Sequence, residues 1–149
     1  MAKRRMKPRD RDRAKWRIGD WQREALKLWK IRVKERADYK CERCSEIYRE
    51  DGKVLQVQAH HLIDCRVMLY AFDPLNGICL CARCHKINKH MSVHANPVAF
   101  MDWLSGYDDG KEIDRWDWWE FRYRTTAETT PPTLKEYPEI VARLTGETK

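Results

Sequence analysis

The chain has 149 residues, enough for one compact domain with tails but too few for two independent hydrophobic cores. Hydrophobic residues make up 42% and aromatic residues 11%, which excludes a largely disordered chain. Charged residues reach 36%, so the core must be small or stabilised by a cross-link such as a bound metal. There is no apolar run of ~18 residues and no secretory signal, so we expect a cytoplasmic protein without a membrane partner.

The net charge of +7 is concentrated at the N-terminus. Residues 1–17 hold nine basic and two acidic side chains, which accounts for the whole excess. We expect residues 1–19 to form a disordered arm that binds a polyanion, with nucleic acid as the favoured partner. The alternative is a solvated leader without a partner. The side chains expected to contact DNA are Lys3, Arg4, Arg5, Lys7 and Arg9.

The first predicted element is a helix over residues 20–36, with Asp20 as its N-cap. Its apolar residues recur at helical spacing: Trp21, Ala25, Leu28, Trp29 and Val33. Short strands are predicted over 54–59 and 77–80, since both segments are rich in aliphatic residues. We expect the tryptophans of the helix to belong to the core.

Further helices are predicted after the second strand, ending near residue 89, and over 98–104. The aromatic segment 116–123 is predicted as either a strand or a helix. It could stack on unpaired bases, but we favour a satellite core, because interleaved acidic residues would repel phosphate. A last helix is predicted within 134–144 if it starts late enough to accommodate Pro138.

Two Cys-x-x-Cys pairs, Cys41/Cys44 and Cys81/Cys84, are separated by 36 residues. Four thiolates in this arrangement predict a tetrahedral structural zinc site. Disulfides or a redox motif are the alternatives, and they suit a chain without export signals less well. Cys79 is expected to be a buried thiol and Cys65 a free one; either is a less favoured further ligand.

Histidines and an asparagine follow in a fixed order between and after these pairs. His60 and His61 follow the first predicted strand, Asn76 precedes the second, and His85 directly follows Cys84. This order resembles the HNH endonuclease family over residues 36–90. Residues 60–103 are similar to small phage-encoded members of that family.

The resemblance implies an α+β fold with a small ββα-metal core and a four-cysteine structural zinc. On this interpretation the nuclease domain with its leading helix spans residues 20–104. An aromatic-rich C-terminal extension spans 105–149.

The resemblance also implies roles for the individual residues. His61 corresponds to the general base that activates water for in-line attack on phosphorus. His60 and His85 correspond to ligands of a catalytic divalent metal, with His94 as the alternative to His85. Asn76 would pin the loop between the strands and so orient His61. The sequence leaves open whether the metal is Mg²⁺, Mn²⁺, Ni²⁺ or Zn²⁺.

The expected function is therefore metal-dependent hydrolysis of phosphodiester bonds in double-stranded DNA. The sequence leaves open whether the protein nicks one strand or cuts both, and whether it acts as a monomer or a homodimer. One alternative is a non-catalytic zinc-ribbon module that binds nucleic acid. Another is an accessory factor that acts with phage packaging or recombination proteins. A zinc deaminase is excluded, because Leu62 and Ile63 follow the histidines and Leu80 precedes Cys81.

Overall fold

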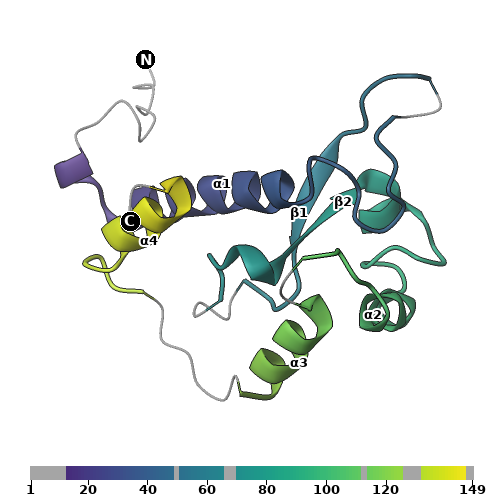
Figure 1. Ribbon diagram of the computed structural model, residues 1–149. Helices are drawn as coiled ribbons and strands as arrows, with labels where there is room; N and C mark the ends of the chain where they lie inside the picture. Colours follow the sequence, from purple (N-terminus) through teal and green to yellow (C-terminus); the bar gives the residue numbers. More distant parts are fainter. Residues whose placement is uncertain (1–12, 49–50, 66–69, 112–113, 126–131, 147–149) are drawn as a thin grey trace.

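The computed structural model describes residues 13–48, 51–65, 70–111, 114–125 and 132–146. It confirms the predicted α+β class, with a two-stranded antiparallel sheet and several helices (Figure 1). The basic residues predicted to contact DNA, Lys3 to Arg9, lie outside the described residues. In the described part of the chain, no helix combines the length and the apolar character needed to cross a bilayer. The main elements are α1 (Ile18–Arg36), β1 (Val57–His61), β2 (Gly77–Cys81), α2 (Pro97–Ser105), α3 (Arg115–Thr125) and α4 (Tyr137–Thr145).

Helix α1 begins at Ile18, two residues before the predicted start. Asp20 is therefore not the N-cap; it lies in the first turn, where its carboxylate accepts a hydrogen bond from the Arg17 N–H at 3.1 Å. Residues 13–19 are also ordered, although we expected them in a disordered arm. The physical reason is Trp16, whose buried ring packs edge-on against Trp21 at 4.7 Å and ties the segment to the core.

Strands β1 and β2 pair with Val57 opposite Cys81 and His61 opposite Gly77. β1 starts three residues later than predicted and ends two residues later. The residues before it turn back on themselves instead, because Val54 bridges to Tyr48 and the Leu55 N–H donates to the Ile47 carbonyl at 2.7 Å. The histidine pair therefore ends β1 and does not follow it.

The helix predicted after the second cysteine pair is only a widened turn, η4 (Arg83–Ile87). Its closing hydrogen bond runs from the Asn88 N–H to the Arg83 carbonyl at 3.0 Å. Helix α2 then begins at Pro97, with the Asn96 side chain accepting from the Ala99 N–H at 3.1 Å. That cap fixes the start of α2 one residue earlier than predicted.

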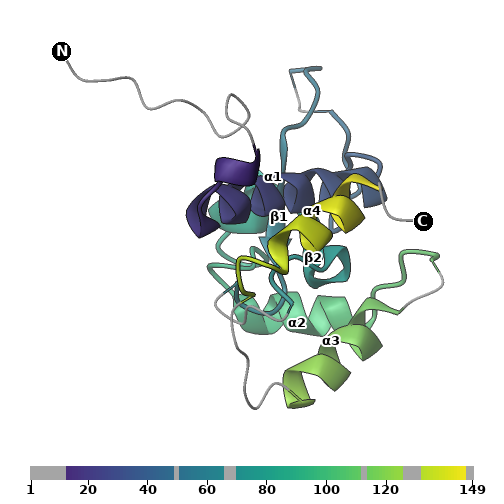
Figure 2. The same cartoon turned by 90° about the vertical axis from the view of Figure 1, so that its left-hand side faces the viewer.

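The sheet lies between two pairs of helices, α1 with α4 and α2 with α3 (Figures 1 and 2). The aromatic segment 116–123, which was predicted as either a strand or a helix, lies in helix α3. α4 starts late, as Pro138 requires, and lies along α1, where Arg32 Nε–H donates to the Leu144 carbonyl at 2.5 Å. Its apolar side chains join the same core cluster as α1 and β2, so the core does not divide at residue 105.

Gly77 marks the closest approach of α1 to the sheet. A Cβ there would collide with Val33 Cγ2 and lie 2.9 Å from Trp29 Cζ2. We expect Gly77→Ala to destabilise the zinc-loaded protein by about 2–3 kcal/mol, the usual cost of overpacking a core. Urea unfolding followed by circular dichroism measures the loss.

Val33→Ala in the Gly77→Ala background tests the cause. If Val33 is the obstacle, the double variant is more stable than the sum of the two single effects predicts. Simple additivity would contradict this close packing.

Candidate metal centres

The four predicted zinc ligands converge in the structure. Cys41 and Cys44 follow α1, Cys81 ends β2, and Cys84 lies in η4. Their sulfur atoms all lie within 4.8 Å of one another, and Cys44 Sγ is 3.9 Å from Cys81 Sγ. A tetrahedral zinc ion with Zn–S bonds of about 2.3 Å separates its sulfurs by about 3.8 Å. The cluster therefore has the size of a zinc site, and these four cysteines can hold a zinc ion.

The electrostatics of the thiols fit the same ion. The Cys84 thiol donates toward Cys41 and lowers the pKa of Cys41 to about 4, and the same contact raises the pKa of Cys84. Burial raises the pKa of Cys44 to about 12. Without a cation, one thiolate in the cluster thus opposes ionisation of its neighbours. A divalent cation supplies the charge that lets all four sulfurs bind as thiolates.

A second cluster consists of His60, His85 and His94, whose ligand nitrogens also lie within 4.8 Å of one another. His85 Nε2 is 3.2 Å from His60 Nδ1 and 3.1 Å from His94 Nε2. Nitrogens bound to one metal at about 2.0–2.1 Å in tetrahedral geometry are separated by about 3.3 Å. We expected His85 as the second ligand, with His94 either replacing or assisting it; the structure brings both to His60.

Hydrogen bonding and burial leave these imidazoles suited to bind a cation. His85 Nδ1–H donates to Gln58 Oε1 at 2.7 Å, so His85 Nε2 keeps its lone pair toward the other two rings. Burial, reinforced by the neighbouring histidines, lowers the pKa of His60 to about 4. Burial, His94 and Lys86 do the same for His85. Both rings are neutral at pH 7, which is the form that ligates metals.

His61 faces the other side of β1, as the alternation of strand side chains requires. Its ring stacks on Trp29 at 3.7 Å with an interplanar angle of 4°. His61 Nε2–H donates to the Ala71 carbonyl at 2.8 Å, which leaves Nδ1 as the basic nitrogen. Burial lowers the pKa of His61, although the Ala71 carbonyl opposes the shift, so the ring is neutral and able to accept a proton.

Asn76 is fully buried and spans the loop that carries Ala71. Its Oδ1 accepts from the Ile63 N–H at 2.7 Å, and its Nδ2 donates to the carbonyls of Ile63 and Tyr70, both at 3.0 Å. Because Tyr70 precedes Ala71, these bonds set the position of the carbonyl that binds His61. Asn76 therefore acts on His61 through the loop that carries Ala71, and its described hydrogen bonds do not involve the histidine cluster.

Two contributors to these sites were missed in the sequence. Gln58 could have been found, since it lies two residues before His60 and therefore on the same face of the strand. The stacking of Trp29 on His61 joins α1 to β1 and had no local signal. We expected Trp29 in the core, and it is fully buried there as well.

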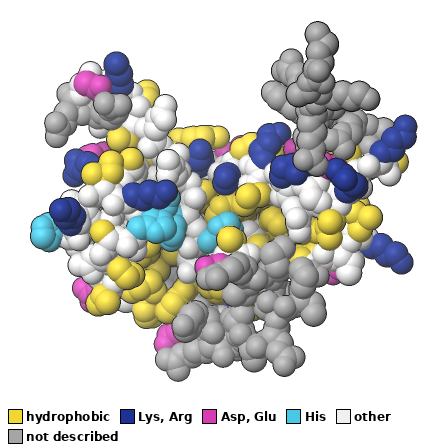
Figure 3. Space-filling model, turned by 180° about the vertical axis from the view of Figure 1, so that it is seen from behind, with side chains coloured by type: hydrophobic (Ala, Val, Ile, Leu, Met, Phe, Trp, Pro, Cys, Tyr) yellow, Lys and Arg dark blue, Asp and Glu magenta, His cyan; other side chains and the backbone are white. Residues whose placement is uncertain are grey.

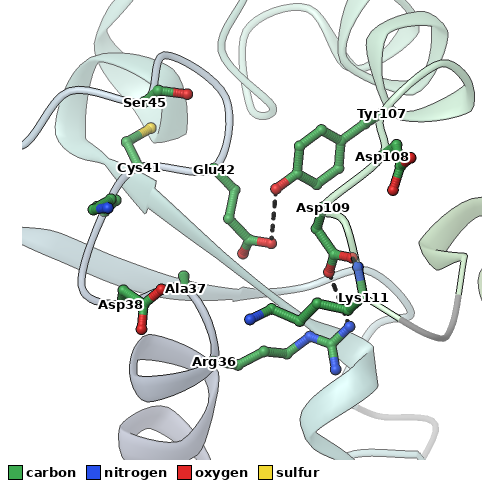
Figure 4. A pocket seen from close by; sticks show the side chains of 11 residues that line it. Arg36, Ala37, Asp38, Cys41, Glu42, Ser45, Tyr107, Asp108, Asp109 and Lys111 are labelled. Atoms are coloured by element: carbon green, nitrogen blue, oxygen red, sulfur yellow. Dashed lines mark hydrogen bonds and ion pairs between the residues drawn. The ribbon is translucent and has the colours of Figure 1, made fainter.

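A separate polar pocket of about 240 Å³ lies beside the first cysteine pair (Figure 4). Several of the charged and polar groups around it interact with one another. Arg36 Nη2 donates to Asp109 Oδ2 at 2.9 Å, the Tyr107 hydroxyl donates to Glu42 Oε1 at 3.4 Å, and the buried Arg115 lies 3.6 Å from Glu42. Glu42 Oε2 also accepts from the Cys79 N–H at 2.6 Å. This network fastens the segment between α2 and α3 to the cysteine cluster.

No protein-family model, no curated protein and no solved structure matches this chain.

We expect the purified protein to contain one tightly bound zinc and Cys44→Ser to lose it. Structural zinc contributes roughly 10–16 kcal/mol of apparent binding free energy in small domains, which exceeds the stability of most of them. The variant should therefore melt at a much lower temperature. Cys65→Ser is the matched control and should keep both zinc and melting temperature. Metal analysis and thermal melting give the answer; a zinc-loaded Cys44→Ser protein would refute the ligand set.

We expect the zinc-loaded protein to bind one further divalent ion at the histidine cluster. In a calorimetric titration with Ni²⁺, His85→Ala and His94→Ala should each weaken binding by at least about 100-fold. Gln58→Ala should weaken it by roughly 10–100-fold, as the loss of an outer-shell partner does. His90→Ala is the control, because the described contact of His90 is through its backbone. Equal binding by His90→Ala and His94→Ala would exclude His94 as a ligand.

Proposed function

We propose that the protein is a metal-dependent endonuclease of the HNH class that hydrolyses phosphodiester bonds in DNA. The observation that carries the proposal is the pairing of two sites at the end of β1. A three-imidazole cluster lies on one side of the strand, and a neutral, oriented His61 lies on the other. A phosphodiester bound across the end of the strand would face both.

His61 would act as the general base. The Ala71 carbonyl fixes its tautomer, Trp29 fixes the plane of the ring, and Nδ1 is left to take a proton from water. Asn76 would act as a positioning residue through the Ala71 loop. Both roles agree with the resemblance between this order of residues and the HNH pattern.

His60, His85 and His94 would hold the catalytic divalent metal. Such an ion stabilises the charge that develops on phosphate oxygens during hydrolysis. The four cysteines would hold the structural zinc next to it, since Cys84 and His85 are consecutive residues of η4. A zinc-ribbon module without activity would need the cysteines but neither the histidine cluster nor an oriented His61.

The test is a supercoiled-plasmid assay with Mg²⁺, Mn²⁺ or Ni²⁺ and with a chelator. We expect metal-dependent nicking or cutting that falls by roughly 10²–10⁴-fold in His61→Ala, the usual contribution of a general base. His61→Ala should keep its zinc, and His90→Ala should keep full activity. Equal cutting by wild type and His61→Ala would disprove the assignment of the base. DNA binding without cutting by any form would favour the binding module, or a factor that needs partner proteins.

A further inference from the structure

We propose that a basic stripe on α1, formed by Arg23, Lys27, Lys30 and Lys34, binds the DNA backbone next to His61. The inference rests on the proposed function only in taking DNA as the partner. It adds a binding surface within the folded domain to the N-terminal arm predicted from sequence.

The four side chains share one face of the helix. They are spaced four, three and four residues apart, which places them within about 60° of one another around an α-helix. Arg23, Lys27 and Lys30 are exposed, and Lys34 is half-buried. The buried residues of α1 lie on a different face: Trp21, Ala25, Trp29 and Val33.

α4 does not cover the stripe. It packs on the edge of α1 that carries Arg32, whose Nε–H donates to the Leu144 carbonyl. By helical geometry this edge lies roughly opposite the stripe. The link between the stripe and the proposed active site is Trp29, which directly precedes Lys30 in α1 and stacks on His61. Lys30 is exposed on the turn of α1 that carries Trp29.

The charge without an ion-pair partner lies in the C-terminal half of the stripe. Arg23 pairs with Asp20, and Lys27 lies 3.3 Å from Glu24. Among the described residues, neither Lys30 nor Lys34 forms an ion pair. An unpaired surface lysine is a strong attractor for phosphate, because no carboxylate competes for it.

A basic group also flanks the other side of the histidines. Lys86 in η4 is exposed and directly follows His85. Figure 3 shows histidine side chains on one face of the molecule, with Lys and Arg side chains above and beside them. The acidic Asp64 lies three residues after His61. A polyanion crossing the end of β1 would thus meet basic groups on both flanks.

The length of the stripe fits a duplex backbone. From Arg23 to Lys34 the helix rises by about 16 Å at 1.5 Å per residue. Along DNA that distance corresponds to about five base pairs at about 3.4 Å each. The stripe can therefore contact several successive phosphates while His61 faces one of them.

The test compares DNA binding by two triple variants in the full-length, zinc-loaded chain carrying His61→Ala, so that the probe is not cut. The stripe variant is Lys27→Gln, Lys30→Gln and Lys34→Gln. The control is Lys53→Gln, Lys111→Gln and Lys135→Gln, which removes the same charge from exposed lysines elsewhere. Glutamine has nearly the helix propensity of lysine, so α1 should stay folded, and circular dichroism checks this. The probe is a fluorescein-labelled 30-base-pair duplex measured by anisotropy from 50 to 300 mM salt.

We expect the stripe variant to bind more weakly than the control and to lose about 2–3 from the slope of log Kd against log salt, about 0.9 per phosphate contact. The control should keep the slope of the parent. An equal loss of affinity and slope in both variants would mean that only the net charge of the protein matters, which would overturn the inference. An unchanged slope in the stripe variant would also overturn it and assign these lysines to another partner.

Failure of the nuclease proposal gives a different result. A protein that never cuts plasmid, but whose DNA binding depends on the stripe, keeps the inference and loses the enzyme. Metal-dependent cutting by a protein whose salt slope is the same with and without the stripe lysines keeps the enzyme and loses the inference.

Discussion

Four cysteine sulfurs that can hold a zinc ion converge at the centre of this small, highly charged chain. The sulfurs come from two segments separated by 36 residues and meet within 4.8 Å. Because Cys81 ends β2 and Cys84 lies in η4, a zinc ion bound by the cluster would fix the end of the sheet and the turn that follows it. His85 directly follows Cys84, so the position of this turn also brings the His85 ring next to His60. The fastening of Glu42 to Cys79 and Arg115 extends this anchor to the segment before α3.

Trp29 provides the second link, between helix α1 and the sheet. Its indole N–H donates to the Asp73 carbonyl at 2.8 Å, and its face covers His61. The neighbouring Gly77 lets α1 approach the sheet this closely. Asp73 and Ala71 belong to the same loop, so one tryptophan restrains both the ring of His61 and the loop that holds it. A buried aromatic residue of the core therefore also shapes the proposed active site.

The arrangement of charge follows from how the helices pack. α4 covers one edge of α1 and leaves the opposite edge to solvent, where basic side chains gather. In the sequence these residues are interspersed with acidic ones, and the chain beyond residue 17 is neutral overall. Helical geometry gathers four basic side chains on one face of α1, where Asp20 and Glu24 pair with two of them. The linear charge pattern therefore pointed to the N-terminal arm and not to this face of α1.

Several features were predictable because they depend on local spacing or composition. The Cys-x-x-Cys pairs predicted the cysteine cluster, the apolar periodicity predicted α1, and Pro138 predicted the late start of α4. The predicted start of α1 and the predicted bounds of β1 were wrong. The start of α1 depends on Trp16, which packs on Trp21 but precedes the apolar repeat of the helix. The start of β1 depends on the bridge between Val54 and Tyr48, which spacing along the strand does not reveal.

The resemblance paired His60 with His85, but tertiary structure alone decided that His94 joins them as well, that Ala71 and Trp29 orient His61, and that α4 shares the core with α1. Each of these contacts joins residues distant in sequence or on separate elements, and their closeness is set by backbone folding and side-chain packing, not by spacing along the chain.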